Sequence, residues 1–276
     1  MDISRRRALA LGGGAVLGAA TTLTTSGPAD ATTGWHRLIV ITANIGRTHK
    51  GQRERAIRDV RHAVSHNGQL DKPLVGWQEI REGDGDRLEP RYINRYFANA
   101  YQNAYVHHAY AHRVPMSIPR EYTILKRRIT KVHGGKSGVT PHRVITQALL
   151  ERADTPGLRF VFANTHYVAG AWNGKHDSHE QWRRNMWQLH FRKHRDEVLT
   201  YWRARGYPVI WTGDVNRTSM PLLLPAEQRA FPHGLDQIAW TPGTNGTQIL
   251  LKRTKTIPMH IDTHNARAAI LHIRHT

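Results

Sequence analysis

Short apolar runs alternate along most of the chain with stretches of helical spacing. Residues 53–66 and 179–204 carry apolar side chains three and four positions apart, which predicts two amphipathic helices. Runs rich in β-branched and aromatic residues predict strands, because such side chains fit a pleated, half-buried surface. The predicted strands cover residues 38–44, 74–79, 122–127, 144–151, 158–166, 207–214, 234–240, 247–252 and 266–273.

The order of these elements indicates the fold class. A strand, a helix and a strand come first and are followed mainly by strands, which is typical of an α/β protein with mixed sheets. Many of the runs are apolar on both faces, so they need cover on both sides. We therefore predict two sheets packed face to face with helices outside. Asn245 and Gly246, between two apolar runs, further predict a hairpin turn.

Polar side chains recur where the predicted strands end. The stretch VIWTGDVN (209–216) ends in Asp214 and Asn216, which share a face if the extended backbone continues. Taken singly, each such residue has a structural explanation as a turn former, a helix cap or a strand start. Taken together they predict one site, because α/β sandwiches build sites at a shared rim of strand ends. The other members of this set are Asn44, Glu79, His166, Asp236 and His264.

The order of the motifs around these residues carries a family resemblance. The series TAN, WQE, NTH, TGDVN, LDQI and a late histidine before an apolar strand resembles the endonuclease/exonuclease/phosphatase superfamily, in its deoxyribonuclease I-like form. The similarity runs from about residue 37 to residue 273. It implies an α/β fold, a four-layer α/β sandwich of two packed mixed β-sheets with helices outside. It also implies hydrolysis of a phosphate ester with a divalent cation, usually Mg²⁺, with Mn²⁺ and Ca²⁺ left open.

The resemblance assigns the metal to Glu79 and Asn44. Such a hard cation needs oxygen ligands, and Mg²⁺ is commonly held by one or two carboxylates together with water and substrate phosphate. Asp262 is a third candidate ligand, but the sequence departs from the family there. The family has Ser, Asp and His in succession, whereas Thr263 here separates Asp262 from His264. The usual aspartate is therefore either missing here or replaced by Asp262, which would reach the metal only through a bulge.

The resemblance also implies how the remaining residues act. Asp214 and Asn216 would position the attacking water. The charge that develops on the phosphate needs donors, which His166, His264 and Asn216 would supply. Asp236 would hold the imidazole of His264 and keep it cationic.

The charge of the chain favours a polyanion as partner. The sequence has 40 Lys and Arg against 21 Asp and Glu, a formal net charge of +19. Phosphate contacts dominate nucleic-acid affinity, so this excess points to a nucleic acid as substrate. The basic residues gather in residues 126–136, 181–185 and 190–195. Lys175 and Arg183, interleaved with tryptophans, are candidate substrate-binding residues.

The first 31 residues predict an export signal. An arginine cluster, a short apolar stretch and the A-x-A sequence at 29–31 are typical of a secretory signal, and SRRRAL resembles the twin-arginine type. The apolar stretch is too short and too rich in Gly, Ala and Thr for stable membrane insertion. The chain has no cysteine, which fits export in a folded state. We expect a secreted monomer with one catalytic domain, residues 32–276.

Three functions remain open from the sequence. The first is a divalent-metal-dependent phosphodiesterase acting as an endonuclease-like enzyme on DNA, with RNA left open. The second is a sphingomyelinase or phospholipid phosphodiesterase on the same fold. The third, prompted by the altered motif at residues 262–264, is a catalytically weak polyanion-binding module. Cleavage of nucleic acid, release of a lipid headgroup, and binding without cleavage separate the three.

Overall fold

The computed structural model describes residues 34–46, 50–80, 88–104, 114–172, 180–261 and 264–276, which belong to one compact unit, Gly34–Thr276. The predicted signal, residues 1–31, lies outside the described residues. Across the described ranges, no helix has the length and apolar character needed to cross a membrane.

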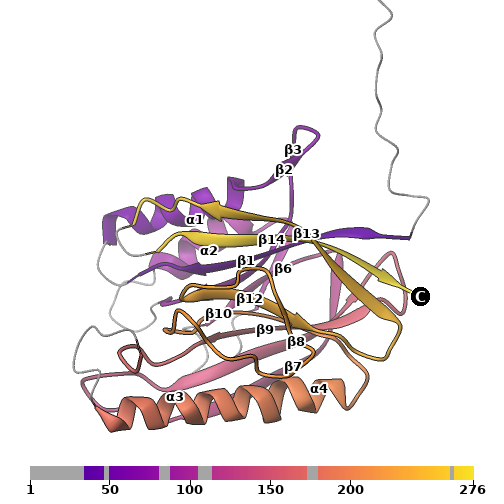
Figure 1. Cartoon of the computed structure of the whole chain (residues 1–276). Coiled ribbons are helices and arrows are strands. Elements are labelled where there is room, and N and C mark those ends of the chain that lie inside the picture. Colours follow the sequence, from indigo (N-terminus) through magenta and orange to yellow (C-terminus); the bar gives the residue numbers. More distant parts are fainter. Residues whose placement is uncertain (1–33, 47–49, 81–87, 105–113, 173–179, 262–263) are drawn as a thin grey trace, which may run out of the picture. The chain divides into compact units, whose positions relative to one another are not determined.

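Two six-stranded mixed sheets form the centre of the unit (Figure 1). Each sheet contains one parallel pair, β1 with β4 in the first and β9 with β10 in the second, and its other pairs are antiparallel. In spatial order, the first sheet consists of β13 (Thr247–Ile257), β14 (Ala266–His275), β1 (His36–Asn44), β4 (Leu74–Gln78), β6 (Met116–Pro119) and β5 (Tyr101–Ala104). The second consists of β11 (Gln228–Arg229), β12 (Asp236–Thr241), β10 (Val209–Asp214), β9 (Arg159–His166), β8 (Arg143–Arg152) and β7 (Tyr122–His133).

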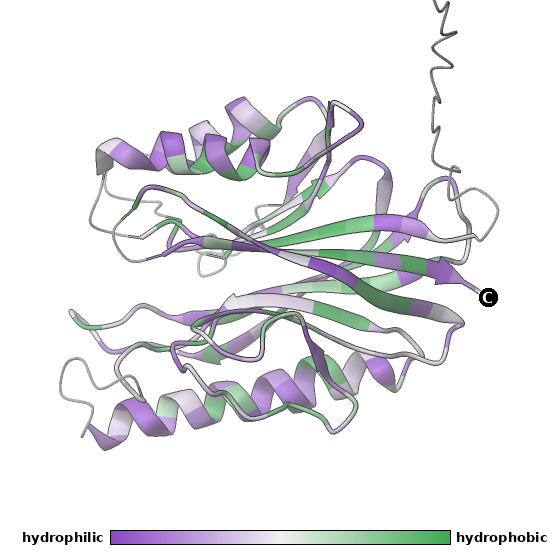
Figure 2. Ribbon diagram, turned by 45° about the horizontal axis from the view of Figure 1, so that its top comes forward, coloured by the Kyte–Doolittle hydropathy of each residue, from purple (hydrophilic) through white to green (hydrophobic). Residues whose placement is uncertain are grey.

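Helices cover the outer face of each sheet. The first sheet packs against α1 (Arg53–His62), which follows the short 3-10 helix η2 (Lys50–Gln52), and against α2 (Leu88–Phe97). The second packs against α3 (Gln181–Lys193) and its continuation through the π-helical turn η3 (His194–Thr200) into α4 (Tyr201–Arg203). Apolar side chains of both sheets pack together between them. Figure 2 shows the hydrophobic colouring along the central strands. The predicted four-layer sandwich is therefore confirmed.

The predicted strands all occur, with differences in the connections. The helix predicted over residues 53–66 ends at His62, because Asn67 and Gly68 take positive φ angles of 49° and 76° and turn the chain into the small hairpin β2 (Ser65–His66) and β3 (Gln69–Leu70). The hairpin predicted at Asn245-Gly246 is wrong. β12 and β13 belong to different sheets, so this turn crosses from one sheet to the other.

Candidate active site

The parallel pairs of the two sheets bring the polar strand ends together. Asn44 at the end of β1 lies opposite Gln78 on β4, one residue before Glu79. In the other sheet Asp214 at the end of β10 lies opposite His166 on β9. β12 begins on the other side of β10, so Asp236 pairs with Asp214. The set predicted from the sequence thus meets at one rim, because parallel neighbours end on the same side.

A tight turn after β10 fixes Asn216. The strand ends at Asp214, and Asn216 takes the left-handed conformation with φ of 49°. Its backbone N–H donates to Asp214 Oδ1 at 2.8 Å, and its Nδ2 donates to the carbonyl of Tyr167 at 3.1 Å. The extended backbone that the sequence predicts does not continue past Asp214, so the two side chains do not share a strand face. Instead, the turn places the Asn216 backbone N–H against the Asp214 carboxylate.

Asp214 is the centre of the buried hydrogen-bond network. Its Oδ2 accepts from Asn44 Nδ2 at 2.9 Å and lies 3.5 Å from His166 Nε2. The same imidazole nitrogen lies 3.9 Å from Glu79 Oε1. Burial, and next the negative charge of Asp236, raise the pKa of Asp214 to about 7, although His264 and the bonds from Asn216 and Asn44 act in the opposite direction. Asp214 is therefore poised to exchange a proton near neutral pH.

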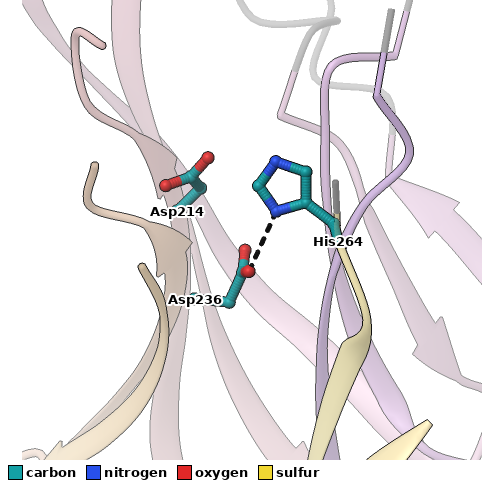
Figure 3. A group of neighbouring side chains, drawn as sticks. All are labelled: Asp214, Asp236 and His264. Atoms are coloured by element: carbon teal, nitrogen blue, oxygen red, sulfur yellow. Dashed lines mark hydrogen bonds and ion pairs between the residues drawn. The ribbon is translucent and has the colours of Figure 1, made fainter. Parts of the chain in front are cut away.

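His264 and Asp236 form an ion pair across the two sheets (Figure 3). His264 Nδ1 lies 3.0 Å from Asp236 Oδ2, and the ring faces Asp214. Burial alone lowers the pKa of His264, but the bond to Asp236 and the charges of Asp236, Asp214 and Glu79 outweigh it and raise that pKa to about 9. The imidazole is therefore cationic at neutral pH, which is the state expected from the sequence.

A pocket of about 370 Å³ opens at this rim. Five of the residues predicted at the strand ends line it, namely Glu79, His166, Asp214, Asn216 and His264. Arg183, also predicted, lies on the pocket wall, where its Nε donates to Glu180 Oε2 at 2.9 Å and its guanidinium to the carbonyl of Ala169 at 3.1 Å. Lys175 and Asp262, together with Thr263, lie outside the described residues.

Among the comparisons with known proteins, solved structures alone give a match. No family model and no curated protein matches the sequence. Among solved structures, an endonuclease/exonuclease/phosphatase family protein from Bacteroides thetaiotaomicron matches with a TM-score of 0.61 and 12% identity over 87% of this chain and 98% of that one. A mannosyl-6-phosphatase of the same organism matches with a TM-score of 0.60 and 13% identity, covering 85% and 99%. D. rerio TDP2 complexed with a single-strand DNA product matches with a TM-score of 0.52 and 12% identity, covering 85% and 98%.

The chain has the endonuclease/exonuclease/phosphatase fold. The resemblance read from the short motifs is thus confirmed at the level of the fold. At 12–13% identity the likeness shows the fold alone.

Oxygen atoms near Glu79, at the rim of the fold, could bind a hard divalent cation. The Glu79 side chain is 18% exposed on the pocket wall. Glu79 follows β4, the strand that pairs with β1, so the Asn44 amide oxygen lies at the neighbouring strand end, where it accepts from the Gly46 N–H at 3.0 Å. Asp236 Oδ1 is a further buried acceptor that has no hydrogen-bond partner among the described residues. Ligand atoms of Asp214, Asp236 and His264 also lie within 4.8 Å of one another, and a metal bound there would displace the proton of the His264 imidazole.

Sequence reasoning missed one charged residue of the pocket. Arg143 begins β8, is 8% exposed and lines the pocket wall, where its guanidinium donates to Thr140 Oγ1 at 3.4 Å. A buried arginine beside carboxylates and histidines supplies positive charge for a bound anion. The only signal in the sequence is an arginine directly before an apolar strand, which by itself is typical of a solvated strand end.

Proposed function

We propose that this protein is a divalent-metal-dependent phosphodiesterase that cleaves nucleic acid, with DNA as the first substrate to test. The observation that carries the proposal is the pocket in which Asp214, His166 and the cationic His264 face one another beside Glu79. The solved structure of a similar fold with a single-strand DNA product supports the class of substrate. The net charge of +19 supports it as well.

The side chains divide the reaction between them. Asp214 accepts a proton from the attacking water, and the bonds from Asn44 and from the Asn216 backbone hold its carboxylate in place. His166 and the cationic His264 donate to the phosphoryl oxygens as negative charge develops there. Asp236 keeps His264 charged. A cation held by Glu79 and Asn44 would supply Lewis-acid polarisation of the phosphate.

The test is a metal-by-substrate panel on the mature protein. We expect cleavage of plasmid or single-stranded DNA with Mg²⁺, Mn²⁺ or Ca²⁺, loss of cleavage with chelator, and a loss of kcat of about 10²–10³-fold in His166→Ala. His66→Ala, on the exposed β2–β3 hairpin, is the matched control and keeps full activity. Intact DNA and RNA with every metal at low salt would overturn the proposal. Release of a headgroup from sphingomyelin vesicles, or of phosphate from a sugar phosphate, would redirect it.

We further propose that the protein acts outside the cell as a monomer. The motifs in residues 1–31 support export by the twin-arginine route. Replacing Arg5 and Arg6 by Lys should stop export and leave the precursor inside the cell. Export of this variant at the normal rate would contradict the proposed route, and a dimer in light scattering would contradict the monomer.

A further inference from the structure

One tryptophan ring at the surface contacts two arginines, and each of these arginines directly follows a residue of the pocket lining, Arg183 or Asn216. The chain has eight tryptophans, all described, and Trp172 is the one whose side chain is exposed, at 38%. The guanidinium of Arg217 lies 4.4 Å from the centre of its ring, and that of Arg184 lies 5.4 Å away. Neither arginine forms an ion pair among the described residues, whereas Arg183 beside them is bound to Glu180.

This group is fixed directly to the catalytic turn. Arg217 follows Asn216, and Trp172 lies in the loop that continues from His166 at the end of β9. The rings of Trp172 and Trp187 meet edge to face at 6.0 Å, and Trp187 Nε1 donates to the Val215 carbonyl at 2.8 Å. The exposed ring is therefore held at a set position relative to the turn that carries Asp214 and Asn216.

We infer that Trp172, with Arg184 and Arg217, is a stacking platform for one base of a single-stranded nucleic acid whose neighbouring phosphate occupies the pocket. This inference rests on the proposed function and names its substrate more closely. An exposed indole offers a flat surface on which any unpaired base can stack. The two guanidiniums lie over the ring, which stays 38% exposed for a base, and they supply positive charge for the phosphates on either side of that base. A duplex does not offer this contact, because its bases are stacked on one another.

The test compares two oligomers of about eight nucleotides, one with bases and one with abasic sugars, so that the phosphates stay the same. We expect the wild type to have a higher kcat/KM for the base-bearing oligomer. In Trp172→Ala the ratio of the two kcat/KM values falls at least about fivefold, the lower end of what stacking on one aromatic ring contributes. Trp172→Phe, which keeps an aromatic face, retains most of the ratio.

Trp35 provides the matched control. It also stacks with an arginine, Arg274 at 4.4 Å, but it precedes β1 at the end opposite Asn44. Trp35→Ala should therefore leave the ratio unchanged. Equal kcat/KM for the two oligomers in the wild type, or a Trp172→Phe variant as impaired as Trp172→Ala, would overturn the inference.

Binding separates this inference from the proposed function. Fluorescence anisotropy with the labelled oligomers in the presence of chelator reports base preference without cleavage. Tighter binding of the base-bearing oligomer, weakened by Trp172→Ala, supports the platform even if no metal gives cleavage, in which case the proposed function alone fails. Cleavage of both oligomers with equal binding supports the proposed function and overturns the platform.

Discussion

At the scale of single residues, the charge of His264 depends first on Asp236. Its hydrogen bond and charge, together with the charges of Asp214 and Glu79, raise the pKa of His264 to about 9 against the effect of burial. In the wild type, activity should therefore persist up to about pH 9 and fall above it, as the imidazole loses its proton. In Asp236→Asn this alkaline limit should move down from about pH 9 toward 6.5, the ordinary pKa of histidine. The dependence of kcat on pH measures the shift.

The control for this prediction is a carboxylate away from the pocket. Asp71 pairs with Arg37 at 3.2 Å in a partly exposed ion pair, and Asp71→Asn should keep the alkaline limit of the wild type. An unchanged limit in Asp236→Asn would show that the charge of His264 is not required for the reaction.

The left-handed turn at Asn216 provides a second test on one residue. Its φ of 49° suits asparagine or glycine, whereas alanine in this conformation costs about 1 kcal/mol. Asn216→Ala and Asn216→Gly both lose the bond to the Tyr167 carbonyl, so both should lose activity. Only the alanine carries the backbone cost, so chemical denaturation should find Asn216→Ala less stable than Asn216→Gly by about 1 kcal/mol. Equal stability would mean that the turn relaxes in the variants.

At the scale of elements, a buried polar contact sets the approach of the two sheets beneath the site. Asn164 on β9 accepts from Gln78 Nε2 at 2.6 Å and from Thr212 Oγ1 at 3.1 Å, and its Nδ2 donates to the Trp77 carbonyl at 2.8 Å. Gly76 on β4 leaves the space for this network, since a Cβ there would lie 2.0 Å from Thr212 Oγ1.

Gly76→Ala should therefore separate β4 from the second sheet. We expect a loss of stability of about 1–3 kcal/mol from overpacking, and a fall in kcat because β4 leads into Glu79. Gly51→Ala is the matched control, because a Cβ at Gly51 meets nothing within 4 Å and its φ is not positive. Thermal unfolding and kcat, measured on both variants, check the prediction. A Gly76→Ala variant as stable and active as Gly51→Ala would contradict it.

The elements also show what the sequence could predict. The strands and the polar residues at their ends were found because each apolar run stops at a polar side chain, as in VIWTGD. The sequence analysis did not predict helix α2. Only two of its apolar side chains, Ile93 and Phe97, are fully buried against the first sheet, so its apolar face is narrow. The role of Arg143 was missed because only the packing of β8 against the pocket shows where its side chain lies. The crossing at residues 245–246 depends on which sheet each strand joins, and a local turn signal does not contain that information.

At the scale of the whole molecule, stability should fall in mild acid. The basic cluster at residues 190–195 includes His190 on α3 and His194 on η3. Both side chains are fully buried and hydrogen-bond to Thr165 and Tyr167 at the end of β9. Burial lowers the pKa of His194 to about 3 and that of His190 well below 6.5. Burial also lowers the pKa of His133 to about 4. The unfolded chain therefore binds more protons than the folded one below pH 6.5. Their contribution is complete above this pH and is lost as the pH falls toward about 4.

Denaturation at a series of pH values measures this loss. Each neutral buried histidine should lower the free energy of unfolding by up to about 1.4 kcal/mol per pH unit below its ordinary pKa. His194→Phe should reduce the slope, and His66→Ala, on the exposed hairpin, should leave it unchanged. Stability that stays constant down to about pH 4 would show that these histidines take up protons in the folded state.

The net charge predicts a salt dependence that distinguishes a nucleic-acid substrate from a small phosphate ester. With +19 on the chain, and +18 once residues 1–31 with their three arginines and two aspartates are removed, a polynucleotide should release several counterions on binding. Its KM should rise at least about tenfold between about 50 and 200 mM salt, with kcat nearly constant. A small phosphodiester makes one phosphate contact in the same pocket, so its KM should change much less. Equal salt dependence for both substrates would mean that only the pocket binds phosphate, and that the positive charge outside it does not bind the substrate.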